Sequence, residues 1–344
     1  MNLLRKNWQQ KLCVVFGVIL ALILIILLGA RLYLRIPVKD YYTVSEKAFV
    51  IPGLPGNLVP QGISFDEETD LFLITGYQKD QTVSPIYLVD HATGEVRDKV
   101  LLLAPDGSDF VFHAGGLSVL GDYVYVAGGS DACLYVYDRS AVLDSEDGTH
   151  IPCLGTFDIY FGADDEIAVA FTTTHDGSLT VGEFYRDPNY LTPDSHKFTT
   201  PAGDYHQALA VTYAASDEPD AIFGLSPVPV EAYTLPNLTQ GMAFYGGKLW
   251  LSTSYGMAFS NIYAYEQSAL QPFSALPAGS GEIPLYALDT AVMSGHYRFP
   301  PMSEEIEFVD GKMYTMCESA SNLYIFGKLT GGRWCYATPM EELE

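Results

Sequence analysis

The sequence predicts an all-β protein, a β-propeller of four-stranded blades preceded by one transmembrane helix. Two observations lead to this prediction. A 19-residue apolar stretch without charge occupies residues 12–30. Five later segments repeat one order of strands and turns, at steps of 53 to 72 residues, close to or longer than the repeat of known propellers.

The apolar stretch LCVVFGVILALILIILLGA (12–30) can nearly span a hydrocarbon core of about 30 Å as a helix that rises about 1.5 Å per residue. We expect an uncleaved signal anchor at 12–30, with a cytoplasmic tail at 1–11, a linker at 31–42 and a propeller domain at 43–344. The alternative is a cleavable signal peptide, whose apolar region usually has about 7 to 15 residues. Basic residues flank the stretch equally and do not fix its orientation. A short N-terminal tail before a long acidic domain, with no second spanning segment, favours a single-pass cell-membrane protein whose C-terminal domain is extracellular.

The distribution of charge along the chain argues against some classes of binding partner. The first forty residues carry six basic residues and one acid, so the net charge of −24 for the chain leaves −29 on the remainder. Twelve Lys and Arg in that remainder form no basic stripe, which argues against nucleic-acid binding and against docking on anionic lipid. The expected partners are the bilayer, through residues 12–30, and an unidentified small-molecule or protein ligand.

Each repeat consists of an outer strand, a crossing, an inner strand and a hairpin. The five copies occupy residues 49–77, 100–129, 156–185, 232–256 and 296–320. The hairpin turns are Asp66 to Asp70, Gly121-Asp122, Asp176-Gly177, Gly246-Gly247 and Asp310-Gly311, all residues that tolerate positive φ. Alternating aromatic residues then predict a third strand at 86–96, 134–140, 208–216, 262–268 and 323–329.

The copies predict five blades. Six blades would result if one of the two insertions, 187–204 or 271–289, contained a degenerate blade. No fourth strand need follow the last copy, so TVSEKAFVI (43–51) is expected to close the ring by pairing with residues 323–329.

The crossings and the turns after the second strands should meet at one mouth of the central channel. The crossings bring Gln61, His113, Asp164, Asp165, Glu166, Gln240, Glu304 and Glu305 to this rim. The turns add Tyr77, Ser130, Asp131, Glu183, Tyr185, Arg186, Ser254, Tyr255, Glu318 and Ser319. We expect ligand contacts from Gln61, Tyr77, Gln240, Tyr255, Arg186, Glu183 and Glu318.

Carboxylates dominate this rim. Like charges packed around one mouth require raised pKa values or a bound cation. Oxygen ligands and irregular loops suit Ca²⁺, which we expect to be held by Asp165, Glu166, Glu304 and Glu305. The alternative is that these acids face solvent on a surface that is acidic everywhere. His113, in FHAGG, is either a general base or a histidine that caps its strand by hydrogen bonds.

The strings PQGISF, LFLITGY and IYLVDHATGEV, and later QGMAF and LWLSTSYG, resemble a superfamily of secreted propellers. It includes regucalcin and gluconolactonase, strictosidine-synthase-like proteins and bacterial surface propellers of the YncE type. The lactonase resemblance implies a Ca²⁺ or Zn²⁺ held by one Glu, two Asn and one Asp at the crossings. This chain has Gln61 and Gln240 at two such places and no Asn, which weakens that interpretation, although Glu304 or Glu305 could match the acid. Strictosidine-synthase-like chemistry would need a catalytic Glu, such as Glu305.

Three functions remain open from the sequence. The first is a membrane-anchored propeller that binds a ligand at its acidic mouth. The second is a divalent-metal-dependent hydrolase of the lactonase or esterase type at the same mouth, with His113 as base. The third is a surface scaffold for protein interactions. No GxSxG, Walker or GxGxxG element in a suitable setting supports other chemistry.

Overall fold

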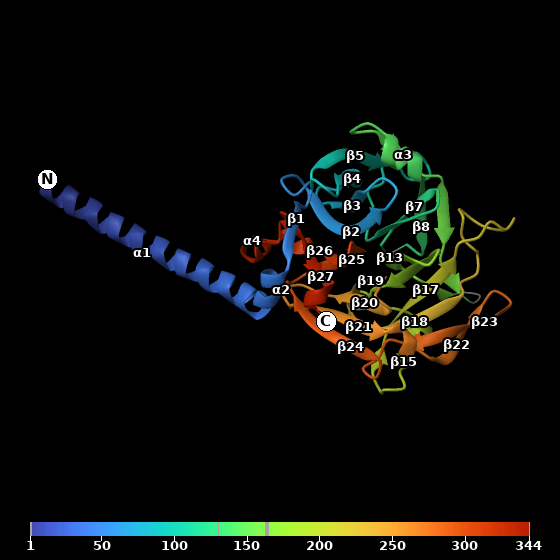
Figure 1. Ribbon diagram of the computed structural model, residues 1–344. Helices are drawn as coiled ribbons and strands as arrows, with labels where there is room; N and C mark the ends of the chain where they lie inside the picture. Colours follow the sequence, from blue (N-terminus) through green and yellow to red (C-terminus); the bar gives the residue numbers. More distant parts are fainter. Residues whose placement is uncertain (1, 130, 162–164, 344) are drawn as a thin grey trace.

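The computed structural model describes residues 2–129, 131–161 and 165–343. Five sheets of four or more strands surround a common centre (Figure 1). The innermost strands are β2 (Leu58–Asp66), β6 (Leu117–Leu120), β13 (Val169–His175), β19 (Thr239–Tyr245) and β25 (Ser303–Val309). Each contacts the innermost strand of the next blade, and β25 contacts β2, so the ring is closed. The predicted five-blade propeller is confirmed.

Blades 1 and 2 follow the predicted strand order. In blade 1, β2 is followed by β3 (Leu71–Gln78), β4 (Pro85–Asp90), β5 (Val96–Leu102) and a short parallel strand, β9 (His150–Ile151). In blade 2, β6 is followed by β7 (Tyr123–Ala127), β8 (Cys133–Asp138) and, after α3 (Arg139–Asp144), β10 (Gly155–Asp158). The hairpin β11 (Tyr160–Phe161) and β12 (Asp165–Glu166) leads to blade 3.

Blade 3 carries an addition from blade 4. Its own strands are β13, β14 (Ser178–Glu183), β17 (Ala208–Ala214) and β18 (Glu231–Leu235). Blade 4 consists of β19, β20 (Lys248–Thr253), β21 (Ser260–Glu266) and, after η3 (Gln267–Ala269), β24 (Met293–Phe299). The insertion at 271–289 forms the hairpin β22 (Pro272–Ala278) and β23 (Gly281–Ala287), and β23 pairs in parallel with β18. This insertion therefore widens blade 3 and is not a sixth blade.

The insertion at 187–204 contains η2 (Asp194–His196) and β15 (Phe198–Thr199), which pairs with β16 (Tyr205–His206). It contributes no blade either.

The predicted hairpin turns are confirmed in all five blades. Positive φ angles occur at Asp70, Gly121, Asp176, Gly246 and Asp310, between the first and second strands. Asp and Gly accept this left-handed conformation more easily than other residues. These turns therefore fix the register between each inner strand and its neighbour.

Blade 5 is closed by the N-terminal strand, as predicted, but with a different partner. β1 (Glu46–Val50) pairs with β27 (Trp334–Pro339), which follows β25 and β26 (Lys312–Cys317). The prediction that residues 323–329 form the third strand is wrong. Residues 323–326 lie in a loop that follows η4 (Glu318–Ala320), and residues 327–329 belong to the short helix α4 (Gly327–Thr330).

Packing explains the difference. A side chain at Gly327 would place its Cβ 1.5 Å from the Ser319 carbonyl oxygen, so this glycine permits the loop to fold back on η4. The strand formed instead by β27 buries the consecutive residues Cys335, Tyr336 and Ala337.

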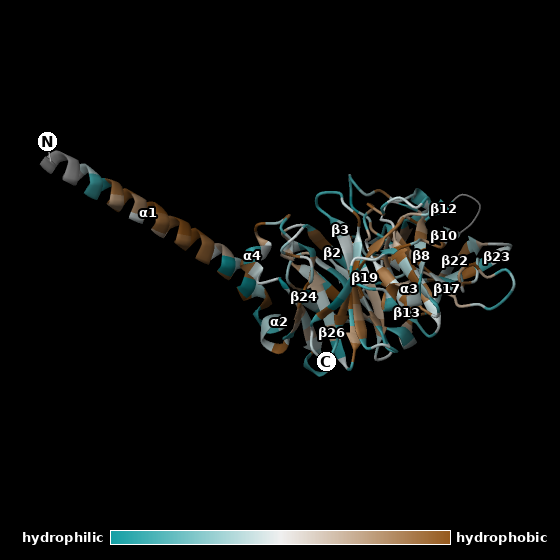
Figure 2. Cartoon of the chain, turned by 90° about the horizontal axis from the view of Figure 1, so that it is seen from above, coloured by the Kyte–Doolittle hydropathy of each residue, from teal (hydrophilic) through white to brown (hydrophobic). Residues whose placement is uncertain are grey.

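The N-terminus forms one continuous helix, α1 (Asn2–Arg35), followed by η1 (Ile36–Val38) and α2 (Lys39–Val44). The segment Trp8–Val44 is long and apolar enough to cross a membrane, and its most apolar window is not buried in the protein. Figure 2 shows this apolar helix projecting away from the propeller. By contrast, α2 is part of the folded domain, since Tyr41 is buried against Phe299 and Tyr336.

Aromatic side chains fill the space between blades 4 and 5. Tyr245 stacks on Phe308 with ring centres 4.8 Å apart, and the buried Trp250 packs against Phe308 at 5.8 Å. The alternating Tyr and Phe of these strands therefore serve packing between blades.

Candidate ligand site at the channel mouth

Irregular pairing at one level of the ring shapes the mouth. The inner strands of blades 1, 3, 4 and 5 shift register between Pro60 and Ile63, Val169 and Phe171, Thr239 and Gly241, and Ser303 and Ile306. A bulge changes the direction of side chains in a strand and is common beside functional sites. In blade 5 the shift falls on Glu304 and Glu305, both of which are buried.

Glu305 bridges the centre of the ring. Its Oε2 accepts hydrogen bonds from the backbone N–H of Ile63 at 3.1 Å and of Leu117 at 3.3 Å. Its Oε1 accepts from the N–H of Thr172 at 2.8 Å. One carboxyl of blade 5 therefore joins the inner strands of blades 1, 2 and 3. Burial raises the pKa of Glu305, and the three N–H donors counteract the rise.

Two glycines give Glu305 its space. A Cβ at Gly116 would lie 1.9 Å from Glu305 Oε1, and a Cβ at Gly241 would lie 2.7 Å from the Glu305 Cα. A side chain at either position would therefore occupy space that Glu305 fills.

Glu304 and Glu318 form the second feature of the mouth. Glu304 is 2% exposed, and its Oε1 has no hydrogen-bond partner among the described residues. Burial first, and then the charges of Glu318 and Glu305, raise the pKa of Glu304 well above its ordinary value. A buried carboxyl oxygen without a partner is rare in folded proteins and requires an explanation.

Two tyrosines hold Glu318. The hydroxyls of Tyr77 and Tyr324 donate to Glu318 Oε1 at 3.0 and 3.1 Å. Burial raises the pKa of Glu318, and these two donors counteract the rise. Tyr324 is not among the expected site residues, because its sequence pattern predicts a strand where the structure has a loop.

His113 continues the cluster toward solvent. Its ring stacks on Tyr77 at 4.5 Å, and its Nε2 donates to Gln61 Oε1 at 2.8 Å. Desolvation by its neighbours lowers the pKa of His113 to about 4, although the residue is exposed at the rim. These contacts of His113 are those of a hydrogen-bonded rim residue. We call Glu304, Glu318, Tyr77, Tyr324, His113 and Gln61 the mouth cluster.

Glu183 lies in a second cluster on blade 3. It is buried, and His196 Nδ1 donates to its two oxygens at 2.8 and 3.1 Å. The N–H of Leu209 donates to Glu183 Oε1 at 2.9 Å. Burial raises the pKa of Glu183, and His196 counteracts the rise. His196 was also missed from the sequence, since it lies in the insertion at 187–204, where nothing marks it as a partner.

The remaining expected site residues have other surroundings than the mouth cluster. Arg186 stacks over Tyr255 with its guanidinium carbon 3.8 Å from the ring centre. Asp165 accepts a hydrogen bond from Ser195 at 3.0 Å, while Glu166 is exposed in β12. Gln240 is half-buried at the bulge of β19. Ser130 and Asp164 lie outside the described residues.

The four expected calcium ligands lie on two different parts of the fold. Asp165 and Glu166 belong to the β11–β12 hairpin, while Glu304 and Glu305 belong to β25. Within residues 2–129, 131–161 and 165–343, no group of three or more His, Cys, Asp or Glu side chains is arranged to hold a metal ion. The alternative that the rim acids face solvent holds for Glu166 but is wrong for Glu304, Glu305, Glu183 and Glu318.

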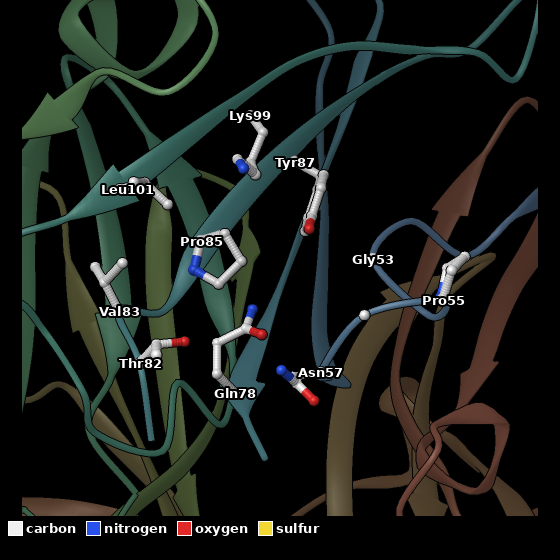
Figure 3. Close-up of a pocket in the computed structure, with 11 residues that line it drawn as sticks. Gly53, Pro55, Asn57, Gln78, Thr82, Val83, Pro85, Tyr87, Lys99 and Leu101 are labelled. Carbon is white, nitrogen blue, oxygen red and sulfur yellow. The ribbon is translucent and has the colours of Figure 1, made fainter. Parts of the chain in front are cut away.

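A separate cavity of about 530 Å³ lies on blade 1 (Figure 3). Its wall includes Tyr87, Lys99, Gln78 and Asn57. Asn57 donates to Asp80 at 2.6 Å, and none of the described lining residues has a buried polar side-chain atom without a partner. The buried carboxyl oxygen without a hydrogen-bond partner, Glu304 Oε1, therefore lies at the mouth and not in this cavity.

No protein-family model matches the chain, and no curated protein matches it. Among solved structures, it is similar to a glutaminyl cyclase from Myxococcus xanthus at 11% identity and a TM-score of 0.41, covering 86% of this chain and 92% of that one. A PQQ-bound aldose sugar dehydrogenase from Streptomyces coelicolor matches at 14% identity and a TM-score of 0.41, covering 85% and 95%. A luciferin-regenerating enzyme matches at 11% identity and a TM-score of 0.42, covering 86% and 94%. The resemblance to propellers is thus one of fold only.

Proposed function

We propose that this protein is a membrane-anchored β-propeller that binds a ligand through a cationic group at its acidic mouth. The observation that supports this most directly is Glu304, whose buried Oε1 has no hydrogen-bond partner among the described residues. A cationic group beside Glu304 would supply the missing partner and would offset the repulsion between Glu304 and Glu318.

The surroundings favour a cation in two further ways. Tyr77 and Tyr324 are half-buried beside Glu318, and aromatic faces attract cations at short range. The strongly acidic domain also raises the local concentration of cations around the mouth.

An organic ammonium group fits the mouth cluster better than a metal ion. Both oxygens of Glu305 already accept backbone N–H donors, so Glu305 is a poor metal ligand. Glu304 and Glu318 then leave two carboxyls, whereas Ca²⁺ takes about six to eight oxygen ligands. An ammonium group needs about three acceptors, which two carboxyls can supply.

The test is calorimetric titration of the purified full chain with n-butylammonium chloride and, separately, with calcium chloride. We expect butylammonium to bind and Glu318→Gln to weaken that binding at least about tenfold, because one of two facing charges is lost. Glu282→Gln, which changes an exposed acid of the β22–β23 hairpin, is the matched control and should bind as the unchanged protein does.

Two results would reject this proposal. Calcium binding without butylammonium binding would replace it with the metal-dependent alternative. Equal butylammonium affinity in Glu318→Gln and the unchanged protein would place the ligand elsewhere.

The anchoring part of the proposal concerns topology. The uncharged apolar stretch at 12–30 lies within α1 and precedes the acidic propeller, which favours export of the propeller. Protease added to intact cells should therefore remove the propeller while the helix remains with the membrane. Protection of the propeller in intact cells, with digestion only after lysis, would reverse the proposed orientation.

A further inference from the structure

The loop between β26 and β27, residues 318–333, lies against the end of the apolar helix. We call it the blade-5 loop. Arg31 Nη1 donates to the Leu329 carbonyl at 3.2 Å, and Arg35 Nη1 donates to the Thr330 carbonyl at 2.8 Å. Tyr42 also donates to the Thr330 carbonyl, at 2.8 Å. Both views show α4 of this loop beside the C-terminal end of α1 (Figures 1 and 2).

These contacts fix the level of the loop along the helix. Arg31 is the first residue after the uncharged stretch at 12–30. If that stretch spans the hydrocarbon core, Arg31 lies at the level of the lipid head groups. Leu329, which is bonded to Arg31, is held at the same level.

The loop exposes apolar side chains close to this level. Ile325 is 87% exposed, and Leu323 is 40% exposed. Ile325 is four residues before Leu329 and two residues before the start of α4. An isoleucine this exposed gains no burial within the protein, so its apolar surface is available to another phase.

The charge of the loop is unlike that of the rest of the domain. Its basic residues Lys328 and Arg333 are exposed, while its acid, Glu318, is buried. With Arg31, they give a local positive surface on a domain that is otherwise strongly acidic. Phosphate groups of lipids complement such a surface.

We propose that the exposed side chains at the tip of the blade-5 loop, Leu323 and Ile325, insert into the interfacial region of the bilayer that α1 spans. Leu323 and Ile325 would enter the boundary between head groups and acyl chains, and Arg31 and Lys328 would meet lipid phosphates. This inference rests on the proposed anchoring by α1. It goes beyond it, because it makes one edge of the propeller a second membrane contact and holds blade 5 at the lipid surface.

The test places an environment-sensitive fluorophore at single positions of the full chain in phosphatidylcholine nanodiscs. In a Cys13→Ser background, the label is attached to Ile325→Cys, to Leu20→Cys within α1, or to Leu191→Cys. Leu191 is the matched control, since it is 63% exposed and lies in the blade 3 insertion. Labelling of the background protein alone corrects for the half-buried Cys133 and Cys153.

We expect brominated phosphatidylcholine to quench the label at 325 and at 20, and to leave the label at 191 unchanged. Quenching at 20 without quenching at 325 would overturn the membrane contact while leaving the anchor intact. Absence of quenching at 20 would instead reject the anchoring on which the contact rests. A blue-shifted label at 325 that brominated lipid does not quench would mean that protein, such as a second copy, covers the tip, and would also overturn the proposal.

Discussion

Replacement of Glu305 by alanine is expected to destabilise the propeller by about 3 kcal/mol or more. The substitution removes the acceptor for the N–H groups of Ile63, Leu117 and Thr172, which are buried in three different blades. Each buried donor left unsatisfied costs about 1–3 kcal/mol. Such a loss is a large fraction of the usual stability of about 5–15 kcal/mol. The measurement is urea unfolding of the purified full chain, followed by tyrosine and tryptophan fluorescence.

Two variants sharpen this experiment. Glu305→Gln keeps one acceptor oxygen and should lose less stability than Glu305→Ala. Glu304→Gln changes the neighbouring buried acid, whose Oε1 accepts no hydrogen bond from the described residues, and should not share the loss. Unfolding of Glu305→Ala at the same urea concentration as the unchanged protein would show that the central carboxyl does not stabilise the ring.

The repeating elements could be predicted from the sequence because their causes are local. A pair such as Asp310-Gly311 specifies a turn with positive φ whatever surrounds it. Residues 323–329 show the limit of this reasoning. Their alternating aromatic pattern is that of a strand, but the fold-back of Gly327 on Ser319 depends on the whole blade. β27, eight residues after Phe326, pairs with β1 instead.

The site was predicted less completely, for a related reason. The repeat correctly places Glu304, Glu305 and Glu318 in blade 5, but it cannot tell which carboxyls are bonded and which are left without a partner. That distinction depends on the bulge between Ser303 and Ile306, which turns two consecutive acids inward. It also depends on partners from loops, such as Tyr324 for Glu318 and His196 for Glu183.

The blade-5 loop contributes both to the mouth cluster and to the contact with the end of α1. Glu318 and Tyr324 belong to the mouth cluster, while Leu329 and Thr330 of the same loop bond to the residues that follow the apolar stretch. A ligand that binds at Glu318 therefore contacts the same short segment that meets the end of α1. The mouth cluster and the contact with the end of α1 therefore share one loop of blade 5.

Replacement of Glu304 by glutamine is expected to make the ligand-free protein more stable than the unchanged protein at higher pH. It is also expected to abolish binding of butylammonium. Glutamine has the volume of the protonated acid and carries no charge. The pKa of Glu304 is raised in the folded protein, so its contribution to stability is fully present below the unfolded value of about 4.3 and is lost as the pH rises through the folded value. The unchanged protein therefore loses stability over a pH range in which Glu304→Gln does not. We expect melting temperatures that agree near pH 4 and separate in favour of Glu304→Gln by pH 8, while calorimetry shows no butylammonium binding by the variant.

The exposed control Glu282→Gln should change neither quantity. A Glu304→Gln protein that is less stable at every pH would mean that the carboxyl is needed for folding, and one that binds butylammonium normally would remove Glu304 from the site.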